Sequence, residues 1–190
     1  IMLIRFGWYF NIMVLRPRAL AYSMMPMQRS RYGARHWRIR TEGVAPSMLT
    51  VFQRHIYRYY QAHGRQFPWR STHDPYNILV SEIMLQQTQT KRVISKYQQF
   101  VAAFPGFREL AAAPLRSVLA LWSGLGYNRR ALSLKRTAAI VMNEYNGTLP
   151  SSIEALVTFP GIGRATASAI AAFAFNTPVV FIETNIRSVF

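Results

Sequence analysis

Apolar residues recur every three or four positions over most of the sequence after residue 48, which is the spacing of amphipathic helices. In the segment 48–61 they fall on roughly one helical face, at Leu49, Phe52, Ile56, Tyr59 and Tyr60. The same pattern predicts further helices over Ile78–Thr90, Lys91–Phe104, Leu115–Trp122, Arg129–Tyr145 and Arg164–Phe175. Only Pro178–Ile182 looks like a strand, and one short strand makes no sheet. We therefore predict an all-α fold.

Proline and glycine residues mark the ends of these helices. The breaks are predicted at Gly64–Pro75, Pro105–Gly106, Pro114 and Gly124–Gly126. Ser151 and Glu154 have the spacing of a capping box, which opens a short helix that runs to Thr158. The turn 159–163, Phe-Pro-Gly-Ile-Gly, joins that short helix to the last helix, so that the two form a hairpin.

Residues 1–47 differ in kind from the rest of the chain. They mix Arg with Trp, Tyr and Met, show no sustained period, and contain one acidic residue, Glu42. An Arg-rich leader with few acids is typical of an organelle transit peptide. The alternative is that Met48 is the true start and that the upstream stretch is not functional protein. We favour the alternative, in part because residue 1 is Ile.

The charge balance is strongly basic, with 23 Lys and Arg against 7 Asp and Glu, and a formal net charge of +16. Residues 1–48 carry eight Arg and one Glu, whereas residues 49–190 carry fifteen basic and six acidic residues. The excess therefore extends into the helical part. Such a balance indicates a polyanionic partner, of which nucleic acid is the commonest.

Other classes of protein fit the composition poorly. The sequence has no cysteine, which excludes disulfide bonds and thiolate metal sites within these residues. No apolar run reaches the roughly 18–20 residues needed to span a bilayer. We therefore expect neither a disulfide-stabilised protein nor a membrane protein.

Two acidic residues stand out as candidates for chemistry. Glu82 lies inside the apolar run 78–85, and Glu183 lies between the apolar residues 179–182 and the segment 184–186. A carboxyl in apolar surroundings has a raised pKa unless it is paired, and a raised pKa suits a general acid at neutral pH. The alternative is a structural carboxylate, satisfied by a buried Arg or by a helix N-terminus.

Two polar features accompany these acids. In the turn 160–163, two glycines let the backbone approach a phosphate closely, and Arg164 adds a cation where the next helix begins. An ordinary turn between two helices is the alternative. The amides of residues 86–89 follow Glu82 and either cap a helix end or fill the gap that a displaced base leaves in DNA.

Five motifs resemble those of the helix-hairpin-helix DNA glycosylase superfamily, and within it the MutY-like adenine glycosylases. They occur in the family's order and spacing between about Gln66 and Val189, at 67–70 (Phe-Pro-Trp-Arg), 74–76 (Asp-Pro-Tyr), 81–89 (Ser-Glu-Ile-Met-Leu-Gln-Gln-Thr-Gln), 121–127 (Leu-Trp-Ser-Gly-Leu-Gly-Tyr) and 159–164 (Phe-Pro-Gly-Ile-Gly-Arg). One such motif would be weak support, whereas five in register are strong.

The resemblance implies a six-helix barrel with its helix-hairpin-helix near residues 151–175. It assigns residues 79–190 to this barrel domain, cut short at its C-terminal end, and residues 48–78 to a companion domain, with 1–47 as an N-terminal extension. It also implies a base-excision repair enzyme that removes adenine mispaired with guanine or 8-oxoguanine. The implied partner is mismatched double-stranded DNA, bound by a monomer that does not enter a membrane. The implied location is the cytoplasmic nucleoid in a prokaryote, or the nucleus or mitochondrion in a eukaryote.

The resemblance also implies a role for each matched residue. Glu82 corresponds to the general acid that protonates the departing adenine. Glu183 stands where the family has an Asp that stabilises the positively charged sugar. The base pocket is implied at Arg65, Trp69, Arg70 and Asn185. Contacts to DNA are implied at Gln87, Thr88, Leu125, Tyr127, Gly161, Gly163 and Arg164, with Leu125 and Tyr127 as wedges against the opposite strand.

The sequence departs from the family pattern at three points. Glu183 is longer than Asp by one carbon–carbon bond, roughly 1.5 Å, and a displacement of that size in a tight site can lower a rate on the order of a hundredfold. Ala165 occupies a position where relatives similar to endonuclease III carry a catalytic Lys, so no Schiff base can form there and we expect a monofunctional enzyme. The family's [4Fe-4S] cluster is expected to have its cysteine ligands beyond residue 190.

Two alternative functions remain at this point. One is a thymine or uracil mismatch glycosylase of the same fold, which Ala165 and Glu183 leave open although the residues 86–88 favour adenine. The other is a non-catalytic DNA-binding fragment that uses only the hairpin and the basic surface.

Overall fold

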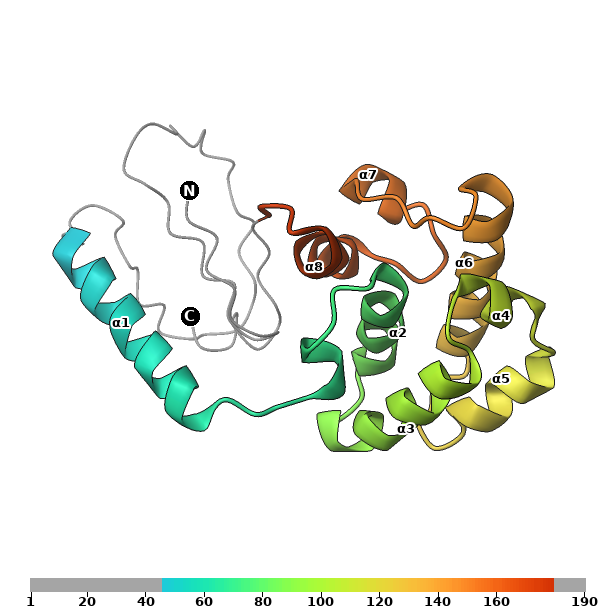
Figure 1. Cartoon of the computed structure of the whole chain (residues 1–190), viewed down its shortest axis with the longest axis horizontal. Helices are drawn as coiled ribbons and strands as arrows, with labels where there is room; N and C mark the ends of the chain where they lie inside the picture. Colours follow the sequence, from blue (N-terminus) through green and yellow to red (C-terminus); the bar gives the residue numbers. More distant parts are fainter. Residues whose placement is uncertain (1–45, 180–190) are drawn as a thin grey trace, which may run out of the picture. The chain divides into compact units, whose positions relative to one another are not determined.

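The computed structural model describes residues 46–179, with side chains from residue 51 onward, and every regular element in that range is helical (Figure 1). The elements are α1 (Pro46–His63), the 3₁₀ helix η1 (Pro68–Arg70), α2 (Pro75–Leu85), α3 (Thr90–Ala103), α4 (Phe107–Ala112), α5 (Leu115–Trp122), α6 (Arg129–Glu144), α7 (Ile153–Leu156) and α8 (Arg164–Phe175). The all-α prediction is thus confirmed. Pro178 and Val179 have no strand structure, and the rest of the predicted strand lies outside the described residues.

The described residues belong to two compact units that divide between Gln66 and Phe67. The first contains α1 and the segment that follows it. The second contains η1 and α2 to α8, and it holds nearly all the residues discussed below. The domain division predicted at residue 78 falls inside α2 and stays a prediction. None of the helices between residues 46 and 179 combines the length and the apolar character needed to cross a membrane.

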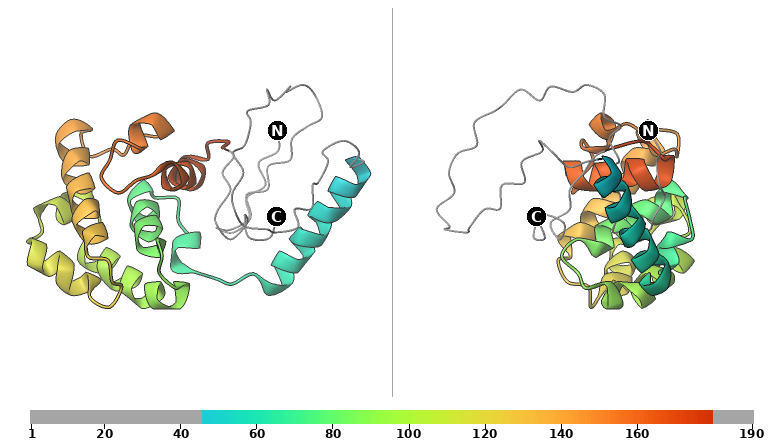
Figure 2. Two further views of the ribbon diagram at one scale, coloured as in Figure 1. Left: turned by 180° about the vertical axis from the view of Figure 1, so that it is seen from behind. Right: turned by 90° about the vertical axis from the view of Figure 1, so that its left-hand side faces the viewer.

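Helix α2 lies at the centre of the second unit, where it contacts η1, α3, α6 and α8 (Figures 1 and 2). Its sequence explains this position, because a helix that is apolar on most sides is stable only when surrounded. The residues with 0% or 1% exposure on α2 are Ile78, Leu79, Val80, Ser81, Ile83 and Met84. Asp74 is the N-cap of the helix, and its Oδ1 accepts a hydrogen bond from the Asn77 amide at 2.8 Å. Pro75 occupies the first turn.

Aromatic side chains join η1 and α3 to this core. The ring of Trp69 stacks on Phe67 at 5.2 Å and meets the edge of Tyr97 at 5.4 Å between centroids. On the same helix as Tyr97, Phe100 contacts Trp122 of α5 edge to face at 5.8 Å. Such pairs stabilise a fold by about 0.5–1.5 kcal/mol each beyond the area they bury.

Helix α4 was not predicted, because six residues between Gly106 and Pro114 are too few to show a helical period. It packs against α6. The ammonium group of Lys135 on α6 donates to the carbonyls of Leu110 and Ala111, at 3.3 and 2.6 Å, and so satisfies the C-terminal end of α4.

Only α5 and α8 have both predicted ends, and most of the other ends differ by one to three residues. Helix α2 ends at Leu85, five residues before the predicted end at Thr90. The cap of the short helix α7 is Ser152 rather than Ser151, and its Oγ accepts from the Ala155 amide at 3.2 Å. The reason for the early end of α2 lies in the site described next.

Candidate functional site

Glu82 occupies the last turn but one of α2 and is half-buried. Its neighbours Ser81 and Ile83 are fully buried, so the carboxyl rises from the most enclosed helix of the unit. The apolar surroundings expected for the Glu82 carboxyl stay a prediction. Three loops lie around the end of α2. Gln86 joins the first to the second by a hydrogen bond, and Arg130 of α6 bonds both the first and the third.

The first loop is the α2–α3 segment, residues 86–89. The side-chain nitrogen of Gln86 donates to the Gly161 carbonyl and to Thr166 Oγ1, both at 3.2 Å. Gln87 is exposed and has a φ of 54°, a left-handed conformation that is uncommon for residues other than glycine. Gln86 thus bonds within the protein and Gln87 faces outward, and the insertion of these amides into DNA stays a prediction.

The second loop is the turn of the hairpin between α7 and α8. Gly161 has a φ of 77°, and a Cβ added to it would lie 3.0 Å from Cβ of Ser133 on α6, so this position requires glycine. Gly163 is the N-cap of α8 and has a φ of −84°. An added Cβ at Gly163 would meet no atom within 4 Å. The space in front of Gly163 and the exposed Arg164 is therefore open to a ligand, at a helix N-terminus that favours anions.

The third loop is the α5–α6 loop, residues 123–128. Gly124, Gly126 and Tyr127 all have positive φ, of 91°, 75° and 49°. The Gly126 carbonyl accepts from the Trp122 indole at 3.2 Å, and the Gly124 carbonyl accepts from the guanidinium of Arg92. The backbone of this loop is thus held at several points.

The two residues expected to act as wedges in this loop face opposite ways. Tyr127 is 65% exposed, whereas Leu125 is 3% exposed and belongs to the core. The Leu125 side chain therefore points into the core, and the Tyr127 side chain two residues later points into solvent. The expectation that Leu125 reaches DNA is therefore revised to a packing role, and Tyr127 remains as the candidate wedge.

The residues expected to line a base pocket are distributed differently. Trp69 is 1% exposed and packed between aromatic rings, so it supports the site from within the core instead of lining it. Arg70 is half-buried, with its guanidinium carbon 4.6 Å from the Phe67 ring centroid. Arg65 is exposed and follows α1 in the other compact unit. Glu183 and Asn185 lie outside the described residues.

Arg130 is the residue that sequence reasoning missed. It lies in the first turn of α6, and its guanidinium donates to the carbonyls of Ile83 and Met84 at 3.0 Å each and to the carbonyl of Gln86. These are the unsatisfied carbonyls at the end of α2, which explains why α2 ends at Leu85. The same side chain donates to Thr88 Oγ1 at 2.9 Å.

A signal for Arg130 was present in the sequence. The first turn of α6 contains Arg129 and Arg130 and no acidic residue, although the positive end of a helix disfavours cations. Burial lowers the pKa of Arg130 from its usual value, in keeping with a guanidinium drawn into the protein. An arginine in that place needs partners elsewhere in the fold, and Arg130 finds them on α2.

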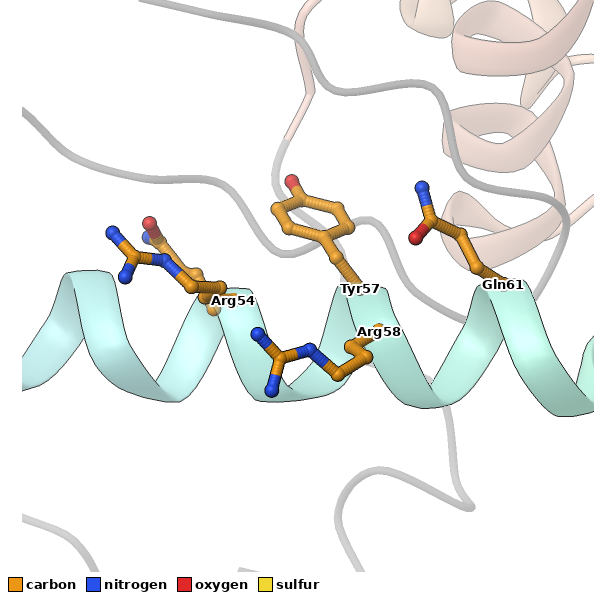
Figure 3. A pocket seen from close by; sticks show the side chains of 5 residues that line it. Arg54, Tyr57, Arg58 and Gln61 are labelled. Carbon is orange, nitrogen blue, oxygen red and sulfur yellow. The ribbon is translucent and has the colours of Figure 1, made fainter.

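A separate hollow follows one face of α1 (Figure 3). It is lined by Gln53, Arg54, Tyr57, Arg58 and Gln61. It belongs to the other compact unit, and none of these residues was predicted to be functional.

Comparison with known proteins gives one family match and a set of named relatives. The model of the family described as "HhH-GPD superfamily base excision DNA repair protein" matches residues 80–190. A protein of Buchnera aphidicola subsp. Baizongia pistaciae named adenine DNA glycosylase is 44% identical over 140 residues, which are 73% of this chain and 40% of that protein. A Mycobacterium tuberculosis protein of the same name is 42% identical over 132 residues, which are 69% of this chain and 43% of that protein. The chain thus spans about two fifths of the length of these relatives.

Two solved structures show the same fold. A thermostable thymine-DNA glycosylase superposes with a TM-score of 0.67 at 32% identity, over 72% of this chain and 63% of that one. A complex of endonuclease III with DNA superposes with a TM-score of 0.66 at 18% identity, over 77% and 68%. Both likenesses cover most of the helical part of the chain described above.

Proposed function

Since the chain belongs to the HhH-GPD superfamily of base excision DNA repair proteins, we propose that it is the catalytic part of an adenine DNA glycosylase. The relatives that carry this name are up to 44% identical to it over the same segment. The observation that supports the proposal best is the half-buried carboxyl of Glu82 on the central helix, with three interconnected loops around the end of that helix. The proposed substrate is adenine opposite guanine or 8-oxoguanine in duplex DNA.

In the proposed reaction, Glu82 donates a proton to the adenine that leaves. Breaking an N-glycosidic bond develops positive charge on the sugar and negative charge on the base, so protonation of the base lowers the barrier. Water then adds to the sugar, which regains neutrality by losing a proton. Glu183 is proposed to stabilise the sugar cation through its carboxylate, with Asn185 beside it, as the family resemblance implies.

No carboxyl can reach the base while it is stacked, so the nucleotide must first leave the helix. Gln87 and Tyr127 are the proposed occupants of the gap, because both are exposed on neighbouring loops. Arg70 is proposed to contact the extruded nucleotide. Trp69 stabilises the pocket only by packing, given its burial.

The hairpin is proposed to hold the DNA backbone. Gly163 leaves room for a phosphate at the N-terminus of α8, and Arg164 adds a positive charge there. Thr88 and Gly161 are proposed to lie beside the DNA, as the family resemblance implies. Such contacts position DNA without reading its sequence.

The residues present do not fit an iron–sulfur cluster. The chain has no cysteine, and the described part between residues 46 and 179 has no group of three or more His, Cys, Asp or Glu that could hold a metal ion. The protein is proposed to act on DNA as a monomer, in the nucleoid or in the nucleus or mitochondrion.

A thymine mismatch glycosylase is the second candidate, because a structure of that class is 32% identical to this chain. Single-turnover cleavage of an adenine:8-oxoguanine duplex and of a thymine:guanine duplex by the full chain separates the two. We expect cleavage of the adenine strand, and faster thymine release would support the second candidate. A non-catalytic DNA-binding fragment would cleave neither.

The role of Glu82 is tested in the same assay. Glu82→Gln keeps the size of the side chain and removes the acid, and we expect the rate to fall by about 10²–10⁴-fold. Glu144→Gln is the matched control, because Glu144 is an exposed carboxylate at the far end of α6. Equal rates for Glu82→Gln and the control would leave Glu82 without a catalytic role.

A further inference from the structure

We propose that Arg130 is a positioning residue that holds the α2–α3 segment and the α5–α6 loop in one fixed arrangement, so that Gln87 and Tyr127 reach DNA together. This inference rests on the proposed function, since it gives the two loops a common task in binding damaged DNA. Arg130 itself binds protein atoms rather than a phosphate.

One guanidinium contacts both loops. On one side, Arg130 donates to the Gln86 carbonyl and, at 2.9 Å, to Thr88 Oγ1. On the other side, it donates to the carbonyls of Leu125 at 3.2 Å and Gly126 at 3.1 Å. The donors of a guanidinium are fixed in a plane, so bonds to two loops also fix the geometry between the loops.

The atoms that Arg130 binds stand directly beside the two strained residues. Its partners on Gln86 and Thr88 lie on either side of Gln87, whose φ is 54°. Its partner on Gly126 immediately precedes Tyr127, whose φ is 49°. Non-glycine residues keep such conformations only where their surroundings hold them. Arg130 is a common support for both.

The aromatic residues of the α5–α6 loop region add a second kind of contact. The guanidinium carbon of Arg130 lies 5.4 Å from the Tyr127 ring centroid and 5.6 Å from that of Trp122. A cation is attracted to the face of an aromatic ring at such distances. The contact favours one direction of the exposed Tyr127 side chain relative to the protein surface.

The turn of the α7–α8 hairpin also contacts α6 and Gln86, so it belongs to the same network of contacts. One turn after Arg130 on α6, Ser133 lies against Gly161, and Gln86 donates to the Gly161 carbonyl. The first two turns of α6 therefore contact all three loops around Glu82.

Amide hydrogen exchange of the full chain tests the arrangement without any need for catalysis. Arg130→Met should increase exchange at least tenfold in both residues 84–90 and residues 123–129, because both loops lose the same support. Arg136→Met is the control, since Arg136 is exposed on the same helix and the change removes the same charge. It should leave both segments within twofold of the wild type.

Arg130→Lys keeps the positive charge and removes the planar set of guanidinium donors. It therefore tests the proposal even if Arg130→Met fails to fold. The compact ammonium group of a lysine cannot reproduce the guanidinium bonds to both loops, so amide exchange should be faster in at least one of them. The proposal is overturned if Arg130→Lys leaves both loops as protected as in the wild type, or if only one loop responds to Arg130→Met.

Binding to DNA gives the second readout. For Arg130→Met, we expect the ratio of affinities for adenine:8-oxoguanine and adenine:thymine duplexes to fall at least tenfold, with an unchanged dependence on salt. A loss that is equal for both duplexes, with the salt slope reduced by about 0.9, would make Arg130 a phosphate contact and refute the proposal. If the wild-type chain does not prefer the mismatched duplex, the proposed function fails, while the exchange experiment still decides the role of Arg130.

Discussion

The two glycines of the hairpin turn should respond in opposite ways to the same substitution. Gly161→Ala forces a side chain into a left-handed conformation, which costs about 1–2 kcal/mol, and places its Cβ 3.0 Å from Cβ of Ser133. Tight overpacking adds on the order of 1 kcal/mol. We therefore expect the free energy of unfolding to fall by about 2–3 kcal/mol, a large part of the 5–15 kcal/mol typical of a domain.

Gly163→Ala is the matched change two residues away. Its φ of −84° is open to all residues, and the added Cβ meets nothing within 4 Å. The substitution should leave stability within about 0.5 kcal/mol or raise it slightly, because alanine restricts the unfolded chain more than glycine does. It should nevertheless weaken DNA binding, because the new methyl group fills the space proposed for a phosphate.

Urea denaturation followed by circular dichroism measures the first effect, and fluorescence anisotropy with a labelled duplex measures the second. Gly161→Ala combined with Ser133→Gly should show a favourable coupling, because it removes the Cβ contact while the backbone strain persists. Equal stability losses for the two alanine variants would refute the reasoning. So would a Gly163→Ala variant that binds DNA like the wild type.

Three further predictions concern the core, a helix cap and the reaction. Burial, and to a lesser degree the Asp74 carboxylate, raises the pKa of Tyr97 to about 12 from 10.0, so the unfolded chain ionises first. The contribution of Tyr97 to stability should thus be constant below pH 10 and fall by up to about 2 kcal/mol as the pH rises towards 12. Burial also raises the pKa of Tyr76, which adds to the same fall, so Tyr97→Phe should make the fall smaller in urea titrations without removing it. Asp74→Ala should lower stability by about 1 kcal/mol in the same titration at neutral pH, through loss of the α2 cap, and an unchanged midpoint would contradict this. Borohydride should trap no covalent adduct with DNA, because Ala165 offers no amine, whereas a strong adduct seen by gel electrophoresis would mean that another residue acts as a nucleophile.

The helices that were predicted well are those whose ends are set by local sequence. Helix α5 begins after Pro114 and α8 follows Gly163, and both have the predicted bounds. The end of α2 was placed five residues too late, because its termination depends on Arg130, which is 44 residues from Gln86 along the chain. Contacts between residues so far apart in the sequence do not affect the local spacing of apolar residues, from which the helices were predicted.

The candidate site was predictable to the same extent. The half-burial of Glu82 follows from its apolar neighbours in the sequence, which a local argument can use. The burial of Leu125 does not, since the direction of a loop side chain depends on the elements around the loop. The support of Gln87 and Tyr127 by one arginine also required the three-dimensional structure.

The enclosure of α2 on most sides has a consequence for how this fold can change. The proposed proton donor belongs to a helix that cannot shift without disturbing the interior, whereas the loops that would meet the substrate lie outside it. Mutations in those loops can alter which base is accepted and leave the geometry of the acid intact. The same helical scaffold can in this way serve for the removal of different bases, because the loops can change in sequence while the buried helix that carries the acid cannot.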